Sequence, residues 1–208
     1  MDTNSPSPVL GIVPVKGFAA AKERLASRLD GRRRAALAAA LAARVTSAWA
    51  TAGHPLLVVA GNEEVAAWAR ARDLEVIPEP SGGGLNGSAH AGVDVAQARR
   101  LPWCVLHADL PLFSAADAAA VAAAAGPDRI VLAPSRDGGT NLIAGSTPFE
   151  FAYGPGSFRS HLWSARHRRR VVVVSTGTAV DIDTPADLEA AAAHRRGRWL
   201  RPILGWPA

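Results

Sequence analysis

The sequence predicts an α/β fold of three layers, in which helices cover both faces of a mostly parallel sheet. Short apolar runs alternate along the 208 residues with longer segments of helical periodicity. The runs are rich in valine, leucine and isoleucine at consecutive positions, which is typical of strands buried on both faces. Alanine dominates the apolar residues as a whole, which favours closely packed helices. Together these observations indicate helices on both sides of one sheet.

Seven apolar runs are expected to form the strands, each flanked by turn-forming or polar residues. They are VLGIVPV (9–15), PLLVVAG (55–61), LEVIPEP (74–80), the first part of WCVLHADLPL (103–112), IVLAPS (130–135), TNLIAGS (140–146) and VVVVST (171–176).

The segments between these strands are expected to be helical. Ser114 caps one helix, which Gly126 closes, and Thr184 caps another with Pro185 at its first position. The apolar C-terminal segment RWLRPILGWPA is expected to cover a sheet edge or a partner subunit, which leaves a homodimer open. The expected helices span 32–51, 63–73, 90–100, 114–126, 157–169 and 184–196.

Length and composition exclude several classes of protein. With 49% hydrophobic and 20% charged residues, the chain is expected to form one globular domain over 1–208 and not a disordered chain. It has no run close to the roughly 20 apolar residues of a membrane span. The polar N-terminal MDTNSPSP lacks the apolar run of a signal peptide. We therefore expect a cytoplasmic protein with no membrane partner, in which the single cysteine, Cys104, is buried and forms no disulfide.

The charge balance favours anionic ligands. The chain has 23 Lys and Arg against 18 Asp and Glu, and a net charge of +5 attracts nucleotides, nucleic acids or small phosphates. Arginine clusters at 32–34 and 166–170 contribute to the excess, although a solvated helix face explains such clusters at least as well.

Polar residues follow several of the expected strands. In sheets of this kind, ligands sit beyond the carboxyl ends of the strands, so these residues are expected to converge there. They are Lys16, Gly82–Asn86, Asp109, Asp137–Asn141 and Asp181–Asp183.

Two of the converging segments suit a nucleotide. PVKGFAAAKERLASRL carries Lys16, Lys22 and Arg24, and a triphosphate needs several cations from one segment. It lacks the glycine spacing of a Walker loop or a Rossmann fingerprint, and a solvated basic loop is the alternative. SGGGLNGSAH would let backbone amides approach a ligand, and Asn86 has the donor and acceptor that suit a nucleobase edge. A flexible connector is the alternative there.

The acidic segments HADLPL and VDIDTP suit a metal ion. Asp109 ends one strand, while Asp181 and Asp183 follow another. Carboxylates from two strand ends can hold magnesium, which prefers oxygen ligands and bridges substrate phosphates. The alternative is structural, because Asp before Leu-Pro forms turns and Asp183-Thr184-Pro185 caps a helix.

The segments RDGGTNLI and YGPGSFRSH suit a phosphate or carboxylate. Thr140 and Ser157 offer hydroxyl groups, the glycines expose amides, and Ser157 stands near a helix N-terminus. A turn followed by a helix cap would use the same amides. The spacing of His54, His107 and His161 is unlike that of metal ligands, so we expect ordinary polar contacts for them.

These motifs, in this order, resemble those of the guanylyltransferases that make the deazaflavin coenzyme F(420). Members of that family are 2-phospho-L-lactate guanylyltransferases or, in actinobacteria, phosphoenolpyruvate guanylyltransferases. The resemblance spans most of the chain, and DGGTN followed by GPGSFRSH is its most specific part. The motifs that carry it are IVPVKGFAAAKERLA, GGGLNGS, ADLPL, DGGTNLI, YGPGSFRSH and DIDTPADL.

The resemblance implies a Rossmann-like nucleotidyltransferase fold with a mostly parallel, mixed sheet. It implies that GTP and a phosphorylated three-carbon acid are the partners, that Mg2+ is the cofactor, and that GMP is transferred to the acid. Phosphoenolpyruvate is the acid we predict, held by Thr140, Gly154 and Ser157. Magnesium would be held by Asp109, Asp181 and Asp183.

The same resemblance assigns the nucleotide site. The catalytic charges facing the GTP phosphates would be those of Lys16, Lys22 and Arg24. The remaining nucleotide-binding residues would be Gly84, Leu85 and Asn86. Three alternatives stay open: another acid (2-phospho-L-lactate or 3-phosphoglycerate), a related nucleotidyltransferase such as a molybdopterin guanylyltransferase, and a basic nucleic-acid-binding module that is not an enzyme.

Overall fold

Seven strands form one sheet in the order β3-β2-β1-β4-β6-β5-β7 in the computed structural model, which describes residues 7–207. Each apolar run that was expected to be a strand contributes one. The strands are β1 (Leu10–Val15), β2 (Leu56–Ala60), β3 (Glu75–Pro78), β4 (Trp103–Leu106), β5 (Arg129–Pro134), β6 (Thr140–Gly145) and β7 (Arg169–Val172).

The sheet is mixed but mostly parallel, which confirms the predicted fold class. β1 pairs in parallel with β2 and β4, and β3 pairs in parallel with β2. β6 runs antiparallel to both β4 and β5, and β7 returns to the parallel direction beside β5. The reversal has a simple cause: only residues 135–139 join β5 to β6, whereas a parallel crossover needs about a dozen residues or more.

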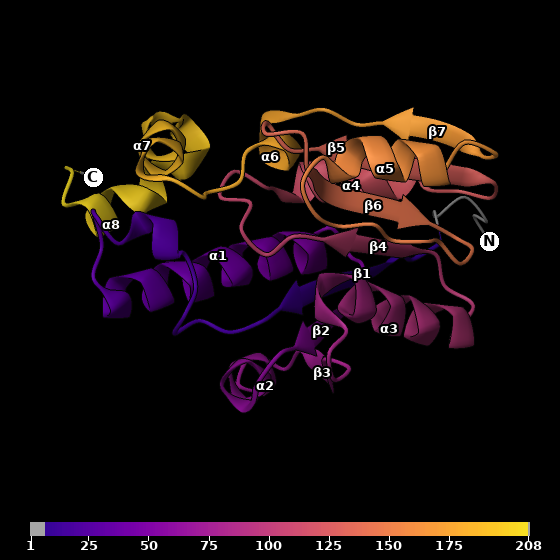
Figure 1. Ribbon diagram of the computed structural model, residues 1–208, viewed down its shortest axis with the longest axis horizontal. Helices are drawn as coiled ribbons and strands as arrows, with labels where there is room; N and C mark the ends of the chain where they lie inside the picture. The colour runs from indigo at the N-terminus through magenta and orange to yellow at the C-terminus, as the bar shows by residue number, and fades with distance from the viewer. Residues whose placement is uncertain (1–6, 208) are drawn as a thin grey trace.

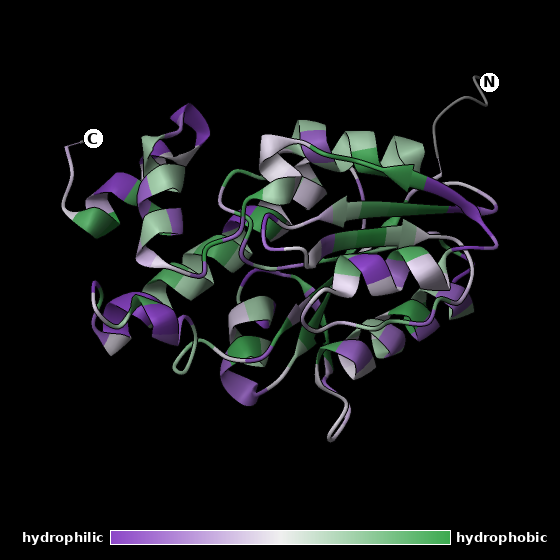
Figure 2. Ribbon diagram, turned by 45° about the horizontal axis from the view of Figure 1, so that its top comes forward, coloured by the Kyte–Doolittle hydropathy of each residue, from purple (hydrophilic) through white to green (hydrophobic). Residues whose placement is uncertain are grey.

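Helices cover both faces of the sheet (Figure 1). α1 (Gly31–Thr51), α2 (Glu63–Arg70) and α4 (Ala115–Ala124) pack on one face, and α3 (Gly84–Ala98) and α5 (Ser157–Ser164) pack on the other. In Figure 2 the strands are mainly green, the colour of hydrophobic residues, and the helices alternate green with purple, as elements with one buried face should. Two apolar cores, one on each side of the sheet, therefore hold the three layers together.

The helix and strand bounds differ from the expected ones at three places. α3 begins at Gly84 and not near 90, because its buried residues Ala89, Val93 and Ala96 dock it on the sheet despite the low helix propensity of glycine. α5 ends before 169, because Arg169 already pairs with β5 as the first residue of β7. β7 ends at Val172, and Ser175 caps the short helix α6 (Thr176–Ala179).

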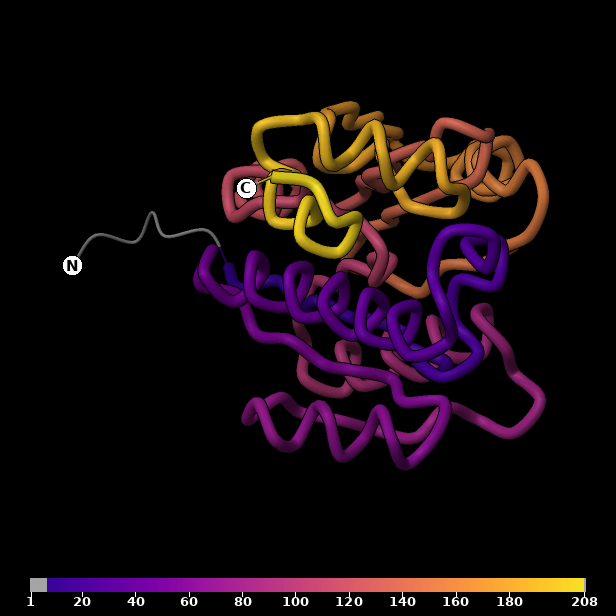
Figure 3. The backbone as a smooth tube through the Cα atoms, turned by 90° about the vertical axis from the view of Figure 1, so that its left-hand side faces the viewer, coloured from indigo at the N-terminus to yellow at the C-terminus, as the bar shows by residue number. Residues whose placement is uncertain are grey.

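The C-terminal segment packs on helix α1, so the expectation that it covers a sheet edge is wrong. α1 extends beyond the sheet, and the C-terminal helices lie over its projecting end (Figures 1 and 3). Leu200 is buried there with Leu37 and Leu41 of α1 in a third apolar cluster. Helix α7 begins at Pro185 with Thr184 as its cap, as predicted. The C-terminal elements are α7 (Pro185–Ala193), η2 (Arg195–Leu200) and α8 (Arg201–Leu204).

Two expectations concern compartment and burial. Cys104 is buried in β4, as predicted. Within residues 7–207, none of the helices combines the length and the apolar character that crossing a membrane requires. Most of MDTNSPSP, for which we expect no signal peptide, lies outside the described residues.

Two glycines of α3 test how closely this helix must approach the sheet. A Cβ on Gly92 would overlap Ile12 of β1, whereas a Cβ on Gly87 would meet no atom within 4 Å. We expect Gly92→Ala to lower the free energy of unfolding by about 1–3 kcal/mol through overpacking. Gly87→Ala should raise it by roughly 0.5–1 kcal/mol through helix propensity. Urea unfolding measures both, and equal effects would contradict the close approach.

Candidate functional site

The polar residues predicted to converge do meet along one edge of the sheet. Lys16 follows the carboxyl end of β1, and His107, Ala108 and Asp109 follow that of β4. Because β6 is antiparallel to β4, its first residue, Thr140, lies at this same edge. The amide of His107 donates to the carbonyl oxygen of Asn141 at 2.9 Å, which joins the end of β4 to the start of β6.

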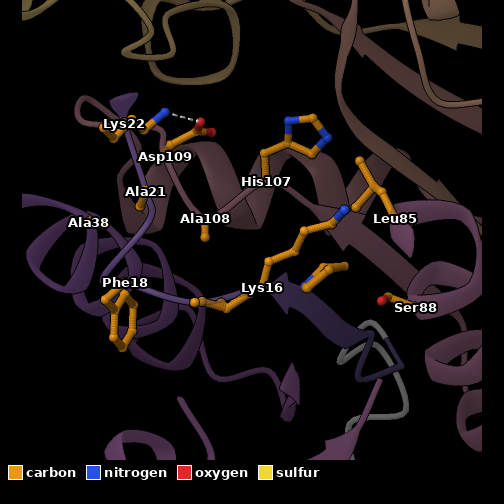
Figure 4. A pocket seen from close by; sticks show the side chains of 13 residues that line it. Lys16, Phe18, Ala21, Lys22, Ala38, Leu85, Ser88, His107, Ala108 and Asp109 are labelled. Atoms are coloured by element: carbon orange, nitrogen blue, oxygen red, sulfur yellow. Dashed lines mark hydrogen bonds and ion pairs between the residues drawn. The ribbon is translucent and has the colours of Figure 1, made fainter. Parts of the chain in front are cut away.

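Lys16 extends toward the N-terminus of α3. Its Nζ lies 4.0 Å from the position that a Cβ on Gly84 would take, and Figure 4 shows the side chain running toward Leu85. The amides of the first helical turn have no carbonyl partner within the helix and carry partial positive charge. A lysine beside such a turn concentrates positive charge that an anion would neutralise. The structure thus brings Lys16, Gly84 and Leu85 together, as the sequence predicted.

Two neighbouring cavities lie along the basic loop that follows β1. The first, of about 230 Å³, is lined by Lys16, Phe18, Lys22, Leu85, His107 and Asp109 among others (Figure 4). The second, of about 680 Å³, runs along residues 16–24 between Asn62 and Asp183. Lys16 and Lys22 line both. A volume of this order suits a ligand the size of a nucleotide.

Lys22 is ion-paired with two of the predicted metal ligands. Its Nζ lies 2.6 Å from Oδ2 of Asp109 and 3.3 Å from Oδ1 of Asp183. Lys22 adopts a left-handed backbone conformation (φ 57°) immediately before the short helix η1 (Glu23–Leu25), a conformation that costs energy in a residue with a Cβ. Arg24 approaches Asp183 only to 3.7 Å and is 75% exposed. Of the predicted cations, Lys22 therefore faces the carboxylates directly.

Burial and charge act in opposite directions on this ion pair. Burial by itself would raise the pKa of Asp109, but the charge and hydrogen bond of Lys22 outweigh it and hold the pKa below its ordinary value. Burial would likewise lower the pKa of Lys22, and Asp109 and Asp183 keep it above its ordinary value. Both groups are therefore charged at neutral pH.

Asp181 is the carboxyl group of the acidic cluster whose ionisation is disfavoured. Its pKa is raised to about 6, first by burial and then by the negative charges of Asp109 and Asp183. Neighbouring negative charges disfavour the ionised form of such a carboxyl group. An additional cation close by would favour the ionised form again. Asp181 is thus electrostatically suited to metal binding.

The metal-binding prediction fits the carboxylates but not a preformed cage. Among residues 7–207, no three His, Cys, Asp or Glu side chains are grouped so that they could hold one ion. One cation, the Lys22 ammonium, already bridges Asp109 and Asp183. The other oxygen of Asp109, Oδ1, is buried without a hydrogen-bond partner in the described part of the chain. These oxygens are the kind that a hard divalent ion prefers.

The predicted acid-binding residues form a buried hydroxyl pair beside an exposed glycine turn. Ser157 Oγ donates to Thr140 Oγ1 at 3.3 Å, and the two residues are 2% and 1% exposed. Ser157 is the first residue of α5, and Gly156 at its N-cap has φ 68°. Gly154 has φ 150°, a conformation that favours glycine. The turn 154–156 is exposed to solvent and leads directly into the buried Ser157.

Asn86 joins the two halves of the site. Its Oδ1 accepts from the backbone amide of Tyr153 at 2.8 Å, so α3 anchors the segment that leads into the glycine turn. The sequence predicted that Asn86 would read a nucleobase, whereas the contact seen among residues 7–207 is this anchoring one, made by its side-chain oxygen. Asp137 closes the β5–β6 turn by accepting from the hydroxyl of Ser135 and from the amide of Gly139.

Two histidines that the sequence analysis set aside lie inside the site. His107 Nε2 is buried without a partner in the described part of the chain, and its ring lies 5.5 Å from that of Tyr153. The ring centroid of His161 lies 4.8 Å from that of Tyr153, and His161 hydrogen-bonds Thr140. A sequence signal existed for each: His107 stands two residues before Asp109, and His161 follows Ser157 by one helical turn. Searching for metal-ligand spacing missed both.

Comparison with known proteins assigns the chain to a family. The family model described as "Guanylyl transferase CofC like" matches residues 9–204. A Sphaerobacter thermophilus protein named phosphoenolpyruvate guanylyltransferase is 38% identical, over 89% of this chain and 93% of that protein. A Phenylobacterium zucineum protein named 3-phospho-D-glycerate guanylyltransferase is 34% identical, over 93% and 94%. A Methanothermobacter thermautotrophicus protein named 2-phospho-L-lactate guanylyltransferase is 30% identical, over 93% and 88%.

Solved structures share the fold. A nucleotidyl transferase from Methanothermobacter thermautotrophicus aligns with a TM-score of 0.66 at 17% identity, covering 94% of this chain and 99% of that one. A Mycobacterium tuberculosis protein solved in complex with manganese aligns with a TM-score of 0.53 at 19% identity, covering 88% and 97%. The fold predicted by the motif resemblance is therefore confirmed.

The Lys22 ion pair predicts a difference between two neighbouring cations. We expect Lys22→Met to lower the free energy of unfolding by about 2 kcal/mol, because it leaves the carboxylate of Asp109 without its charged partner. Arg24→Met should change it by no more than about 0.5 kcal/mol, since exposed ion pairs contribute little. Guanidinium unfolding without divalent metal measures both.

The loss of stability expected for Lys22→Met should also depend on pH. The folded state lowers the pKa of Asp109, so the ion pair stabilises the fold above the unfolded pKa of about 4. That contribution is lost as the pH falls through the lower, folded value. The gap between Lys22→Met and wild type should therefore shrink in acid, and a gap that stays constant would show that Asp109 is not its source.

Proposed function

The chain belongs to the CofC-like guanylyl transferase family, and on that basis we propose that it transfers GMP from GTP to phosphoenolpyruvate. The products would be enolpyruvoyl-2-diphospho-5'-guanosine and pyrophosphate, in the biosynthesis of coenzyme F(420). One structural observation supports this most directly. A basic loop that lines two cavities, the Asp109 carboxylate and a buried hydroxyl pair all lie at one edge of the sheet. A reaction between two anions needs a separate binding site for each of them.

The basic loop and the start of α3 would bind GTP. Lys16, beside the first amides of α3, would contact its phosphates together with Lys22 and Arg24. Several cations are needed because each neutralises only part of the triphosphate charge. Gly84, Leu85 and Asn86 would line the nucleotide at the end of the loop. Lys22 reaches phosphate by giving up its ion pair with Asp109, an exchange of one anionic partner for another.

The acidic cluster would hold magnesium through Asp109, Asp181 and Asp183. The support is the partner-free Oδ1 of Asp109, the raised pKa of Asp181, and the cation already bridging Asp109 and Asp183. The manganese in the fold relative from Mycobacterium tuberculosis agrees with a divalent metal in this fold. When bound, such an ion neutralises charge on the α-phosphate and on the leaving pyrophosphate.

The chain would act mainly by positioning the two substrates. A phosphate oxygen of the acid attacks the α-phosphorus of GTP, the bond from that phosphorus to the bridging oxygen breaks, and pyrophosphate leaves. The attacking phosphate is already ionised at neutral pH, so no general base is required. Thr140, Ser157 and the amide at Gly154 would hold the acid in line with the α-phosphorus. Orientation and charge neutralisation then supply most of the rate enhancement.

The choice among acids rests on the relatives. Four of the curated relatives between 35% and 38% identical are named phosphoenolpyruvate guanylyltransferases. The proteins named for 3-phospho-D-glycerate and 2-phospho-L-lactate are 34% and 30% identical. The three acids differ by an enol double bond or a hydroxyl group, which pocket shape discriminates.

We expect the purified protein with GTP and Mg2+ to release pyrophosphate in the presence of phosphoenolpyruvate. Mass spectrometry of the product formed with the three acids in competition identifies the acceptor. A product from another acid would correct the substrate within the same reaction. If no pyrophosphate were released with any of the three acids, the proposed function would be overturned. CTP in place of GTP serves as the nucleotide control.

We expect Asp109→Asn to lower turnover by roughly 100-fold or more, because it removes one charge from the metal-holding cluster. Asp94→Asn is the matched control, since Asp94 is exposed on the outer surface of α3 and should retain wild-type turnover. Titration with Mn2+, followed by electron paramagnetic resonance, measures metal binding independently of turnover. Wild-type turnover and wild-type Mn2+ affinity in Asp109→Asn would reject the metal assignment.

A further inference from the structure

His161 is a buried histidine whose two ring nitrogens both have partners. It lies in α5, one turn after Ser157, and is 0% exposed. Its Nδ1 lies 2.9 Å from Thr140 Oγ1, and its Nε2 lies 2.9 Å from the backbone nitrogen of Ala152. The imidazole therefore connects the hydroxyl pair with the segment that leads into the glycine turn.

The backbone contact fixes which nitrogen carries the proton. A backbone N–H can only donate, so the amide of Ala152 makes Nε2 an acceptor. Burial, and then the neighbouring His107, lower the pKa of His161 to about 4, so the ring is neutral and carries one proton at neutral pH. That proton must be on Nδ1. His161 consequently donates to Thr140 Oγ1 and does not accept from it.

This direction decides whether the hydroxyl pair has a proton to give. Thr140 and Ser157 have two hydroxyl protons, and their mutual contact at 3.3 Å uses one. If His161 accepted from Thr140, the second proton would be used as well, and the pair would offer an anion only lone pairs. Because His161 donates, one hydroxyl proton remains available. An anionic ligand requires that donor, since oxygen lone pairs facing a carboxylate or phosphate repel it.

We propose that His161 is a positioning residue that sets the Thr140–Ser157 pair as a hydrogen-bond donor to the anionic group of the acceptor acid. The inference rests on the proposed function for the identity of that acid, and on the hydrogen-bond geometry for the role of His161. His161 touches neither substrate: it acts through Thr140 on one side and through the Ala152 amide on the other. The ring is held in place by Phe149 and Tyr153, whose centroids lie 5.9 and 4.8 Å away.

Two substitutions separate the two contacts. The amide nitrogen of asparagine can replace Nδ1 as the donor to Thr140, while it loses the contact with Ala152. The amide oxygen of glutamine can replace Nε2 as the acceptor from Ala152, while it loses the donor to Thr140. We expect His161→Gln to raise the KM for the acceptor acid by roughly 10- to 100-fold at an almost unchanged KM for GTP. His161→Asn should restore most of that loss.

Matched controls exclude a merely structural role. His167→Gln changes an exposed histidine just beyond α5 and should leave both KM values at their wild-type levels. Thr140→Val should raise the acceptor KM in wild type but add little in a His161→Gln background, because that variant has already removed the hydrogen bond that orients the Thr140 hydroxyl group. If Asn and Gln at 161 impaired both substrates equally, or if the Thr140→Val and His161→Gln effects multiplied, the positioning role would be overturned.

One measurement tests the inference without any substrate. The 15N chemical shifts of the His161 ring in the wild-type protein report which nitrogen is protonated. A protonated Nδ1 with an unprotonated Nε2 is the expected result, and the opposite tautomer would overturn the inference whether or not the protein turns over. If the tautomer is as expected but none of the three acids reacts, the proposed function fails while the donor assignment stands.

Discussion

The site depends on the reversal of a single strand. Because β6 runs antiparallel between β4 and β5, its first residue, Thr140, lies at the edge where β1 and β4 end. Had the connection from β5 been a helical crossover, this residue would start a strand at the opposite edge, far from Asp109. The reversal follows from the five-residue turn closed by Asp137. A short, glycine-containing turn in one half of the sheet thus brings Thr140, which we propose binds the acid, to the same edge as Lys16, which we propose binds the nucleotide.

Charge compensation is the second constraint at this edge. Three carboxylates, Asp109, Asp181 and Asp183, lie near one another, and the fold satisfies only part of their need for positive charge. Lys22 neutralises two of them at the cost of a left-handed backbone conformation, while the pKa of Asp181 stays raised to about 6. An acidic cluster that is only partly compensated favours the binding of any further cation. On the proposed function, a bound metal ion would take over this compensation and free Lys22 to contact phosphate.

The sequence was sufficient to predict the strands and the polar residues that meet at the edge of the sheet, because both depend on local patterns. Buried strands are continuous apolar runs, and residues at strand ends are collected by the topology, as with Lys16 and Asp109. The start of α3 and the start of β7 were missed because tertiary pairing decided them: Val93 and Ala96 dock a glycine-rich helix turn, and Arg169 pairs with Arg129. His161 and the anchoring role of Asn86 were missed because hydrogen bonds between segments far apart in the chain leave no local signal.

The contacts of Asn86 and His161 both hold the segment that leads into the glycine turn, which, within residues 7–207, none of the other predicted site residues does. The proposed acid-binding site combines the exposed glycine turn 154–156 with the two buried hydroxyl groups of Thr140 and Ser157. Asn86 holds the amide of Tyr153 and His161 holds the amide of Ala152, so successive backbone groups ahead of the turn are fixed from α3 and from α5. α3 also lies beside Lys16 at its first turn, so one helix contacts both the basic loop and the segment ahead of the glycine turn. On the proposed function, both substrates would contact elements joined through α3, which would help to hold them in the alignment that an in-line transfer between two anions requires.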